Sequence, residues 1–450
     1  MILCDEGKRF MRWKWFYQLR DYLKSSLWIV PLVAIPLELA AIRILQRLDS
    51  LLGWSFLGLG KTGAAAMLNA IVTATLSFVV FTFGSLLVAL QVASGQMTPR
   101  IIATILVRNN VVRYTAGLFV FTLLFAISTM NRIEDSVPQL VVFVAACLGV
   151  FCFAAFLFLI DYAARLLRPI SIVSLVGQAG LAVIQSVYPE PTQGPNRSDY
   201  QRPRPGSPNR IIQHHGLSEI ILAANRDELV AEAERAKGVI EFVPQIGDFI
   251  ATDEPLFKLY GGATSLDDAK LRSTVVFGPE RTMEQDPTFA YRIIVDIALK
   301  ALSPAINDPT TAVIAIDQLH HLLRKAGNQN LRTDEIFDKS GQLRVIFRTP
   351  NWEDFVHLAF TEIRFCGAQN MQIARRLRAM IENLIQTLPK HRHAILQSQL
   401  ALLDRDIEKY FGYPEDLALA RVGDTQGLGG ASGVGHMPFD HRRPRRPDLA

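Results

Sequence analysis

Residues 64–90 read AAAMLNAIVTATLSFVVFTFGSLLVAL and contain no charged side chain. A helix needs about 20 apolar residues to cross roughly 30 Å of hydrocarbon, so this stretch is long enough to span a bilayer. Small and polar residues recur along it at seven-residue spacing, at Ala70, Ser77, Gly84, Gln91 and Thr98. This spacing keeps them on nearly one face of a helix. Such a face predicts either close packing on a neighbouring helix or the wall of a polar path.

Three further apolar stretches accompany this one, and together they predict four membrane-spanning helices. The predicted spans are residues 26–45, 64–90, 114–130 and 137–160. Lys and Arg are concentrated ahead of the first span, between the second and third, and after the fourth. Because such residues favour the cytoplasmic side, we expect the N-terminus and everything after the fourth span to be cytoplasmic.

The first predicted span contains one carboxylate, Glu38. A charged group at that depth is expensive unless it is paired, protonated or facing water. One interpretation is that Glu38 contacts an ion or a proton within the membrane. The other is that it lies near the far interface and pairs with Arg43, five positions later. The sequence leaves both interpretations open.

The composition combines an apolar first part with an ordinary soluble second part. Half of the 450 residues are hydrophobic, and the net charge of +5 is too small and dispersed to indicate nucleic-acid binding. The four cysteines form no CxxC pair, and no HExxH, GxSxG, P-loop or GxGxxG motif occurs. We therefore assign no cofactor, no metal site and no catalytic residue, and expect a protein that is not an enzyme.

The pattern after the spans predicts a separate α+β domain. Six prolines within residues 189–210 exclude a core element there. Alternating and helical patterns follow, and the chain ends in a Gly-rich and Arg/Pro-rich tail. The predicted parts are a basic and aromatic cytoplasmic N-terminus (1–25), a transmembrane domain with four spans and an exit helix (26–188), a Pro-rich linker (189–210), a cytoplasmic α+β domain (211–422) and a disordered tail (423–450).

The densest polar cluster of the soluble part surrounds two helices that begin alike. Asp286-Pro287 and Asp308-Pro309 each place an Asp at the N-cap and a Pro at the first helical position. The cluster consists of Glu280, Arg281, Thr282, Gln285, Asp286, Asn307 and Asp308. These residue types would suit a small anionic ligand or an ion. Alternatively, the aspartates only cap helices, while the other members satisfy backbone groups in the connections.

Three segments carry a resemblance to a known family. They are RTMEQDPTFAYRIIVDIALKALSPAINDPTTAVIAIDQL (281–319), LVALQVASGQMTPRI (87–101) and IGDFI followed by PLF (246–257). They resemble, in the same order, the predicted bacterial membrane proteins grouped as domain-of-unknown-function family 2254. The resemblance extends over roughly residues 25–415. It implies a multi-span domain in the bacterial inner membrane with a cytoplasmic C-terminal domain, and it implies no activity or catalytic residue.

Two functional hypotheses follow for this predicted inner-membrane protein. In the first, it forms an oligomeric channel or transport-type pore around the small-residue face of residues 64–90, gated by the cytoplasmic domain. We expect a homo-oligomer in this case, because four helices rarely enclose a path. In the second, the helices only anchor a sensor or scaffold, whose cytoplasmic domain binds a small ligand or a protein partner through the 280–308 cluster. The ion or ligand stays undefined in both.

Overall fold

The computed structural model describes residues 23, 26, 28–52, 58–96, 110–133, 137–166, 168–192, 206–331 and 334–430. It divides into two compact units, Met1–Ile172 with Ala269–Thr274, and Val173–Asp268 with Val275–Ala450. We describe each unit by itself. The predicted basic N-terminus (1–25) lies almost entirely outside the described residues.

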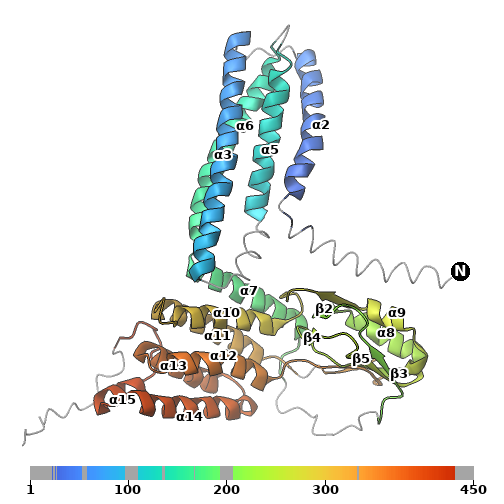
Figure 1. Ribbon diagram of the computed structural model, residues 1–450, viewed down its shortest axis with the longest axis vertical. Helices are drawn as coiled ribbons and strands as arrows, with labels where there is room; N and C mark the ends of the chain where they lie inside the picture. Colours follow the sequence, from blue (N-terminus) through green and yellow to red (C-terminus); the bar gives the residue numbers. More distant parts are fainter. Residues whose placement is uncertain are drawn as a thin grey trace, which may run out of the picture. The chain divides into compact units, whose positions relative to one another are not determined.

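The first unit is a bundle of long apolar helices (Figure 1). They are α2 (Ile29–Leu52), α3 (Lys61–Gln96), α5 (Asn110–Met130) and α6 (Gln139–Leu166). Helix α5 packs against the other three, and its apolar stretch is half buried. At one end of the bundle, Ile42, Leu68, Phe125 and Val141 come from the four helices into one buried cluster. Much of the remaining surface of these helices is apolar and exposed, as expected of helices that face lipid.

Each predicted span lies on one of these four helices, although the helix bounds differ by several residues. A fifth helix, α7 (Pro169–Val187), is also long and apolar enough to cross a membrane. It corresponds to the predicted exit helix. The described residues thus contain five candidate spans, not only the four expected.

One side of α7 is buried from Val173 onward in the second unit. Buried residues recur along it at helical spacing: Val173, Val176, Gly177, Gly180, Ile184 and Val187. Gly180 is the point of close approach, because a Cβ there would lie 2.7 Å from Ala290 Cβ and 3.1 Å from Leu322 Cδ2. Only a glycine allows the three helices to meet at this distance. Helix α7 is therefore part of the core of the second unit.

The strands of the second unit form two sheets. They are β1 (Arg210–Gln213), β2 (Glu219–Ala224), β3 (Gly238–Phe242), β4 (Phe249–Ile250), β5 (Pro255–Gly261), β6 (Val275–Gly278), β7 (Glu335–Phe337) and β8 (Leu343–Phe347). The five-stranded sheet has the order β1-β5-β3-β8-β7, and the three-stranded sheet has the order β4-β2-β6. All pairs are antiparallel except β3 and β8. Helix α8 (Arg226–Ala236) packs against β3 and β8, and the short α9 (Asp268–Ser273) precedes β6.

The second unit also contains a layer of helices, which confirms the predicted mixture of helix and sheet (Figure 1). They are α10 (Pro287–Ala301), α11 (Pro309–Gly327), α12 (Trp352–Gly367), α13 (Met371–Thr387), α14 (His393–Tyr410) and α15 (Pro414–Ala420). Helices α10 and α11 form a hairpin; α12 packs on α10, and α13 packs on α11 and α14. Trp352, Tyr291, Phe355 and Phe360 are fully buried in this layer.

Part of the predicted linker pairs with the second unit. Asn330 N donates to Glu190 O (2.8 Å), and Thr192 N donates to Asn328 O (2.8 Å). Pro191 forms an isolated bridge with Gln329 between these two bonds. Residues 193–205 lie outside the described residues.

The C-terminal segment differs from the expectation of disorder from Gly423 onward. Asp424 is buried, and its carboxylate accepts hydrogen bonds from the backbone N–H groups of residues 426, 427 and 429. Arg375 and Arg376 of α13 donate to carbonyl groups of the same segment. Residues 423–430 are therefore held on α13, and residues 431–450 lie outside the described residues.

Candidate functional site

The small and polar face of α3 lies on the outside of its bundle. Its exposed members are Ala70, Ser77, Gly84 and Gln91. Thr98 lies outside the described residues. Leu68, Thr75 and Thr82 are buried, each two positions before an exposed member. Two positions correspond to about 200° around a helix, so the two rows face opposite ways. The predicted face is therefore not packed against any other described helix of the first unit.

Glu38 is buried near the middle of α2, with 2% of its surface exposed. Its Oε1 atom has no hydrogen-bond partner. Arg43 is exposed, and among the described residues no ion pair joins it to Glu38. The structure thus differs from the interpretation that Glu38 pairs with Arg43 at the far interface. Positions five apart point about 140° away from one another on a helix, which explains why the two side chains separate.

Buried threonines line the interior of the same bundle. They are Thr75 and Thr82 of α3 and Thr115, Thr122 and Thr129 of α5. Thr129 Oγ1 donates to Phe125 O (2.7 Å), whereas Thr82 Oγ1 has no hydrogen-bond partner. The thiol of Cys152 on α6 donates to Thr122 Oγ1 (3.2 Å). These threonines were not among the predicted site residues, although their spacing of seven within each helix was a signal for them.

The 280–308 cluster does not form a single site, because α10 separates its two ends. Helix α10 has 15 residues and is therefore about 22 Å long. Asp308 caps α11 at the far end, where its Oδ1 accepts from Thr311 N (3.1 Å). Asn307 precedes it with a φ of 48°, and its N–H donates to Ser303 O (2.8 Å). Both residues thus act in the local structure of the connection between α10 and α11.

Asp286 at the other end also caps a helix, but only one of its oxygen atoms is used. Oδ1 accepts from Thr288 N (3.0 Å) and Phe289 N (3.3 Å) at the start of α10. Oδ2 is buried without a hydrogen-bond partner. It faces Gly247, where a Cβ would overlap it and where φ is +91°. Burial raises the pKa of Asp286, against the opposing effects of the Thr288 hydrogen bond and of Arg281.

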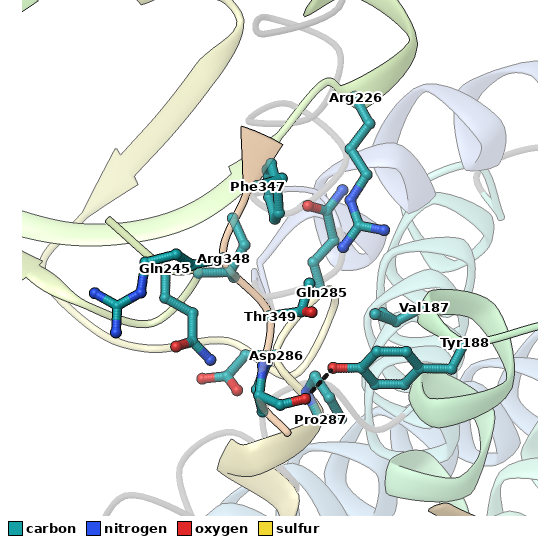
Figure 2. Close-up of a pocket in the computed structure, with 12 residues that line it drawn as sticks. Val187, Tyr188, Arg226, Gln245, Gln285, Asp286, Pro287, Phe347, Arg348 and Thr349 are labelled. Atoms are coloured by element: carbon teal, nitrogen blue, oxygen red, sulfur yellow. Dashed lines mark hydrogen bonds between the residues drawn. The ribbon is translucent and has the colours of Figure 1, made fainter. Parts of the chain in front are cut away.

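A small cavity adjoins Asp286 (Figure 2). Its polar lining comes from Tyr188, Arg226, Gln245, Gln285, Asp286 and Thr349, with Arg348 at the edge. The empty space is about 230 Å³ including its opening to solvent. The enclosed part has room for roughly one water molecule. Tyr188 donates a hydrogen bond to Pro350 O (3.3 Å), and Gln285 Oε1 accepts from Ala224 N (3.0 Å).

Arg226 contributes a half-buried positive charge to this cavity. Its guanidinium lies 4.6 Å above the Phe347 ring and beside the Gln285 amide (Figure 2). Among the described residues it forms no ion pair. Burial lowers the pKa of Arg226, while Tyr188 and Asp227 act in the opposite direction. Burial also raises the pKa of Tyr188, so at neutral pH its hydroxyl is a donor.

At this end of α10, three further cluster members lie outside the cavity lining. Glu280 and Arg281 are exposed, and the partly buried Thr282 has an Oγ1 atom without a hydrogen-bond partner. Conversely, Tyr188, Arg226 and Gln245 could not be predicted as lining residues, because they come from segments far apart in the chain. Over the described residues, no three His, Cys, Asp or Glu side chains come together to hold a metal ion. The cavity could accommodate a water molecule or one small polar group.

Comparison with known proteins agrees with the features of the first unit. The model of a family described as "Predicted membrane protein (DUF2254)" matches residues 24–383. The chain is 26% identical over 425 residues to the uncharacterized protein Rv1290c of Mycobacterium tuberculosis, covering 89% of this chain and 79% of that one. The uncharacterized protein Mb1321c of Mycobacterium bovis is similar to the same extent. No solved structure matches the chain.

Proposed function

Because the chain belongs to the DUF2254 family of predicted membrane proteins, we propose that it is a transport-type protein of the bacterial inner membrane. In this proposal, small ions cross the bilayer along the inside of the bundle formed by α2, α3, α5 and α6. The second unit lies in the cytoplasm and controls the passage.

The observation that carries the proposal is the polar interior of an otherwise apolar bundle. A membrane anchor has no need of a buried carboxyl group without an ion-pair partner, and such groups in membrane helices mark ion or proton routes. Glu38 is such a group within the part of the chain that the structure describes. The buried threonines extend the polar surface along α3 and α5 in steps of seven residues. Seven residues correspond to about 10.5 Å of helix, so three such levels cover most of the hydrocarbon thickness.

A topology of four spans is supported by the packing of α7. A helix that crosses the bilayer beside α6 could not also bury Val173, Gly180 and Val187 in a water-exposed domain. With α7 outside the bilayer, the chain crosses it four times. The segment before α2 and the segment after α6 then lie on the same side. Arg165 and Arg168, at the end of α6, favour the cytoplasm for that side.

Control by the second unit is supported by chain connectivity. Helix α7 begins only three positions after α6 ends, and it packs on α10 and α11 through Gly180. A movement of the α10–α11 hairpin would therefore be transmitted to α6. The outward small-residue face of α3 supports assembly of several copies, because small residues allow close helix approach in membranes.

The alternative function, a membrane-anchored sensor or scaffold, is favoured by a different observation. The cavity beside Asp286 contains Arg226, whose guanidinium has no ion-pair partner among the described residues. A small anionic group could bind there. Under this alternative, removal of polar groups from the bundle interior would have no effect on function.

The test uses the full chain in liposomes that contain dyes for protons, Na⁺ and K⁺. The variants are Thr75→Val and Thr122→Val, which replace a buried hydroxyl by a methyl of similar size. Thr73→Val is the matched control, because Thr73 is exposed on the same helix. We expect the two buried-site variants to lower the flux at least several-fold and the control to leave it unchanged. Equal flux in all variants, or a folded wild type without flux, would refute the path.

A further inference from the structure

Two contacts define the register of α2 against α5. Near one end, Gly117 lies against Val30, since a Cβ at Gly117 would be 2.6 Å from Val30 Cγ1. Near the other end, Arg132 donates a hydrogen bond to Gln46 Oε1 (2.6 Å). The partners are 87 positions apart in the first contact and 86 in the second. The helices therefore run parallel, and each residue of α2 is level with the α5 residue about 87 positions later.

Glu38 is thus level with residues 124–125 of α5, and a third contact gives its level on α6. Leu140 N donates to Asp49 Oδ1 (2.8 Å). Helix α6 returns from α5 through a short connection and runs antiparallel to α2. Glu38 lies eleven positions before Asp49, so it is level with the residue about eleven positions after Leu140, which is 151.

A contact between α3 and α6 shows which residue of α3 lies at this level. Phe78 of α3 stacks on Phe156 of α6, with ring centroids 4.5 Å apart. Both helices run in the same direction, so Cys152 is level with the residue one position before Thr75. The hydrogen bond from Cys152 Sγ to Thr122 Oγ1 (3.2 Å) then places Thr122 of α5 at this level too.

The four helices therefore each contribute one polar side chain to a single level of the bundle, which we call the Glu38 layer. Its members are Glu38, Thr75, Thr122 and Cys152, with 2%, 1%, 0% and 0% of their surface exposed. The layer lies near the middle of the helices. Glu38, for example, is about 14 Å from the start of the 24-residue helix α2. Its Oε1 atom has no hydrogen-bond partner.

No opposite charge compensates Glu38 at this level within the described part of the bundle. The charged residues of the other three helices are Lys61, Arg113, Asp161 and Arg165. Each is at least nine positions, about 13.5 Å along its helix, from the layer member of that helix. On α2 itself, the nearest charge is Arg43, which is exposed. Besides Glu38, the titratable member of the layer is Cys152, whose thiol is engaged with Thr122.

We propose that the Glu38 layer is a proton-binding site and that the proton is the ion that uses the path. The proposal names the substrate of the function proposed above, and in that respect rests on it. A proton bound to the Glu38 carboxylate removes a charge that burial in hydrocarbon disfavours strongly. Release of the proton requires water or a conformational change at the layer. Proton binding is thereby linked to the state of the bundle.

A proton fits this layer better than a metal cation. Hard metal cations take six or more oxygen ligands. In the described part of the bundle, the buried oxygen-bearing side chains at this level come from Glu38, Thr75 and Thr122, whereas Thr73 and Ser77 of α3 are exposed. Thr122 already accepts a hydrogen bond from Cys152. A single carboxylate, in contrast, is sufficient to bind a proton.

The test measures the protonated carboxyl directly, in the full chain reconstituted in lipid. Infrared spectroscopy detects the C=O stretch of a protonated carboxylic acid, and dicyclohexylcarbodiimide labels such groups within membranes, as read by mass spectrometry. The variant is Glu38→Gln, and the control is Glu353→Gln, since Glu353 is exposed on the second unit. Circular dichroism and size-exclusion chromatography establish that each variant is folded.

We expect the C=O band and the label at residue 38 to be lost in Glu38→Gln and retained in the control. At constant pH, the label should not respond to Na⁺ or K⁺. Absence of both signals in the folded wild type would overturn the proposal. Loss of the label on addition of Na⁺ at constant pH would instead assign a metal cation. A protonated Glu38 in a protein without flux would refute the path and leave the proton site intact.

Discussion

Substitution of Gly247 by alanine tests whether the position of Asp286 depends on the turn beside it. Gly247 has a φ of +91°, and a Cβ there would overlap the buried Oδ2 of Asp286. Gly341 is a matched control, because its φ is +76° and a Cβ there would meet nothing within 4 Å. Both alanine variants carry the backbone strain of a positive φ, but only Gly247→Ala displaces the carboxylate.

The two contributions have different sizes. A left-handed backbone costs a residue with a Cβ about 1–2 kcal/mol, and this applies to both variants. The overlap with Asp286 adds an overpacking cost of about 1–3 kcal/mol at Gly247 alone. Displacement of the N-cap carboxylate from Thr288 and Phe289 falls within that range, since loss of a cap costs about 1 kcal/mol. We therefore expect Gly247→Ala to be more destabilising than Gly341→Ala by about 1–3 kcal/mol.

Hydrogen–deuterium exchange of the full chain is the appropriate measurement, because it reports on the first turn of α10 separately. A difference of about 1–3 kcal/mol corresponds to exchange about 5- to 150-fold faster at the amides that Asp286 caps. In Gly341→Ala these amides should exchange at the wild-type rate. If both variants left the first turn of α10 equally protected, the carboxylate would not depend on Gly247, and the reasoning would be refuted.

Three further predictions concern other parts of the chain. Burial raises the pKa of Asp286, so the second unit should lose stability as the pH rises from the ordinary Asp range through that raised pKa. In thermal unfolding measured over a series of pH values, Asp286→Asn should remove this part of the pH dependence of stability. Asp424→Ala removes the acceptor of three backbone N–H groups; limited proteolysis should then cut within residues 423–430, whereas an unchanged digest would contradict the described contacts. Leucine at Ser77 and Gly84 adds bulk on the outer face of α3; chemical cross-linking should show fewer oligomers while each chain stays folded, and unchanged cross-linking would exclude this face as an interface.

The sequence was sufficient for features that depend on neighbouring residues. Asp-Pro at positions 286 and 308 predicted the starts of α10 and α11 correctly, because a cap and its N–H partners lie within three residues. The four apolar stretches identified the helices of the first unit for the same reason: hydropathy is a local property. Helix ends were less predictable, since α2 continues seven residues past the predicted span.

The cavity beside Asp286 could not be predicted, because its residues meet only through tertiary packing. Tyr188 directly follows α7, Arg226 begins α8, and Gln245 lies in a turn, so no spacing in the chain relates them. For the segment after Gly423, the sequence instead led to a wrong prediction, that of disorder. Its glycine content suggested disorder, but the unpaired N–H groups of such a segment are well suited to one buried carboxylate, that of Asp424. Composition describes how easily a segment bends and not what it binds.

The two rows of α3 show why a repeat of seven indicates a face but not its direction. The row with Ser77 and Gly84 and the row with Thr75 and Thr82 have the same spacing, and only the second is buried within the chain. In lipid, apolar surface gives no hydrophobic drive towards the interior, so which face turns inward depends on packing and hydrogen bonding. On α3, the row with Thr75 and Thr82 is the one that faces the interior of the bundle. The small-residue outer face is then left for close contact with another helix, so the proposed path and the proposed assembly lie on opposite sides of α3.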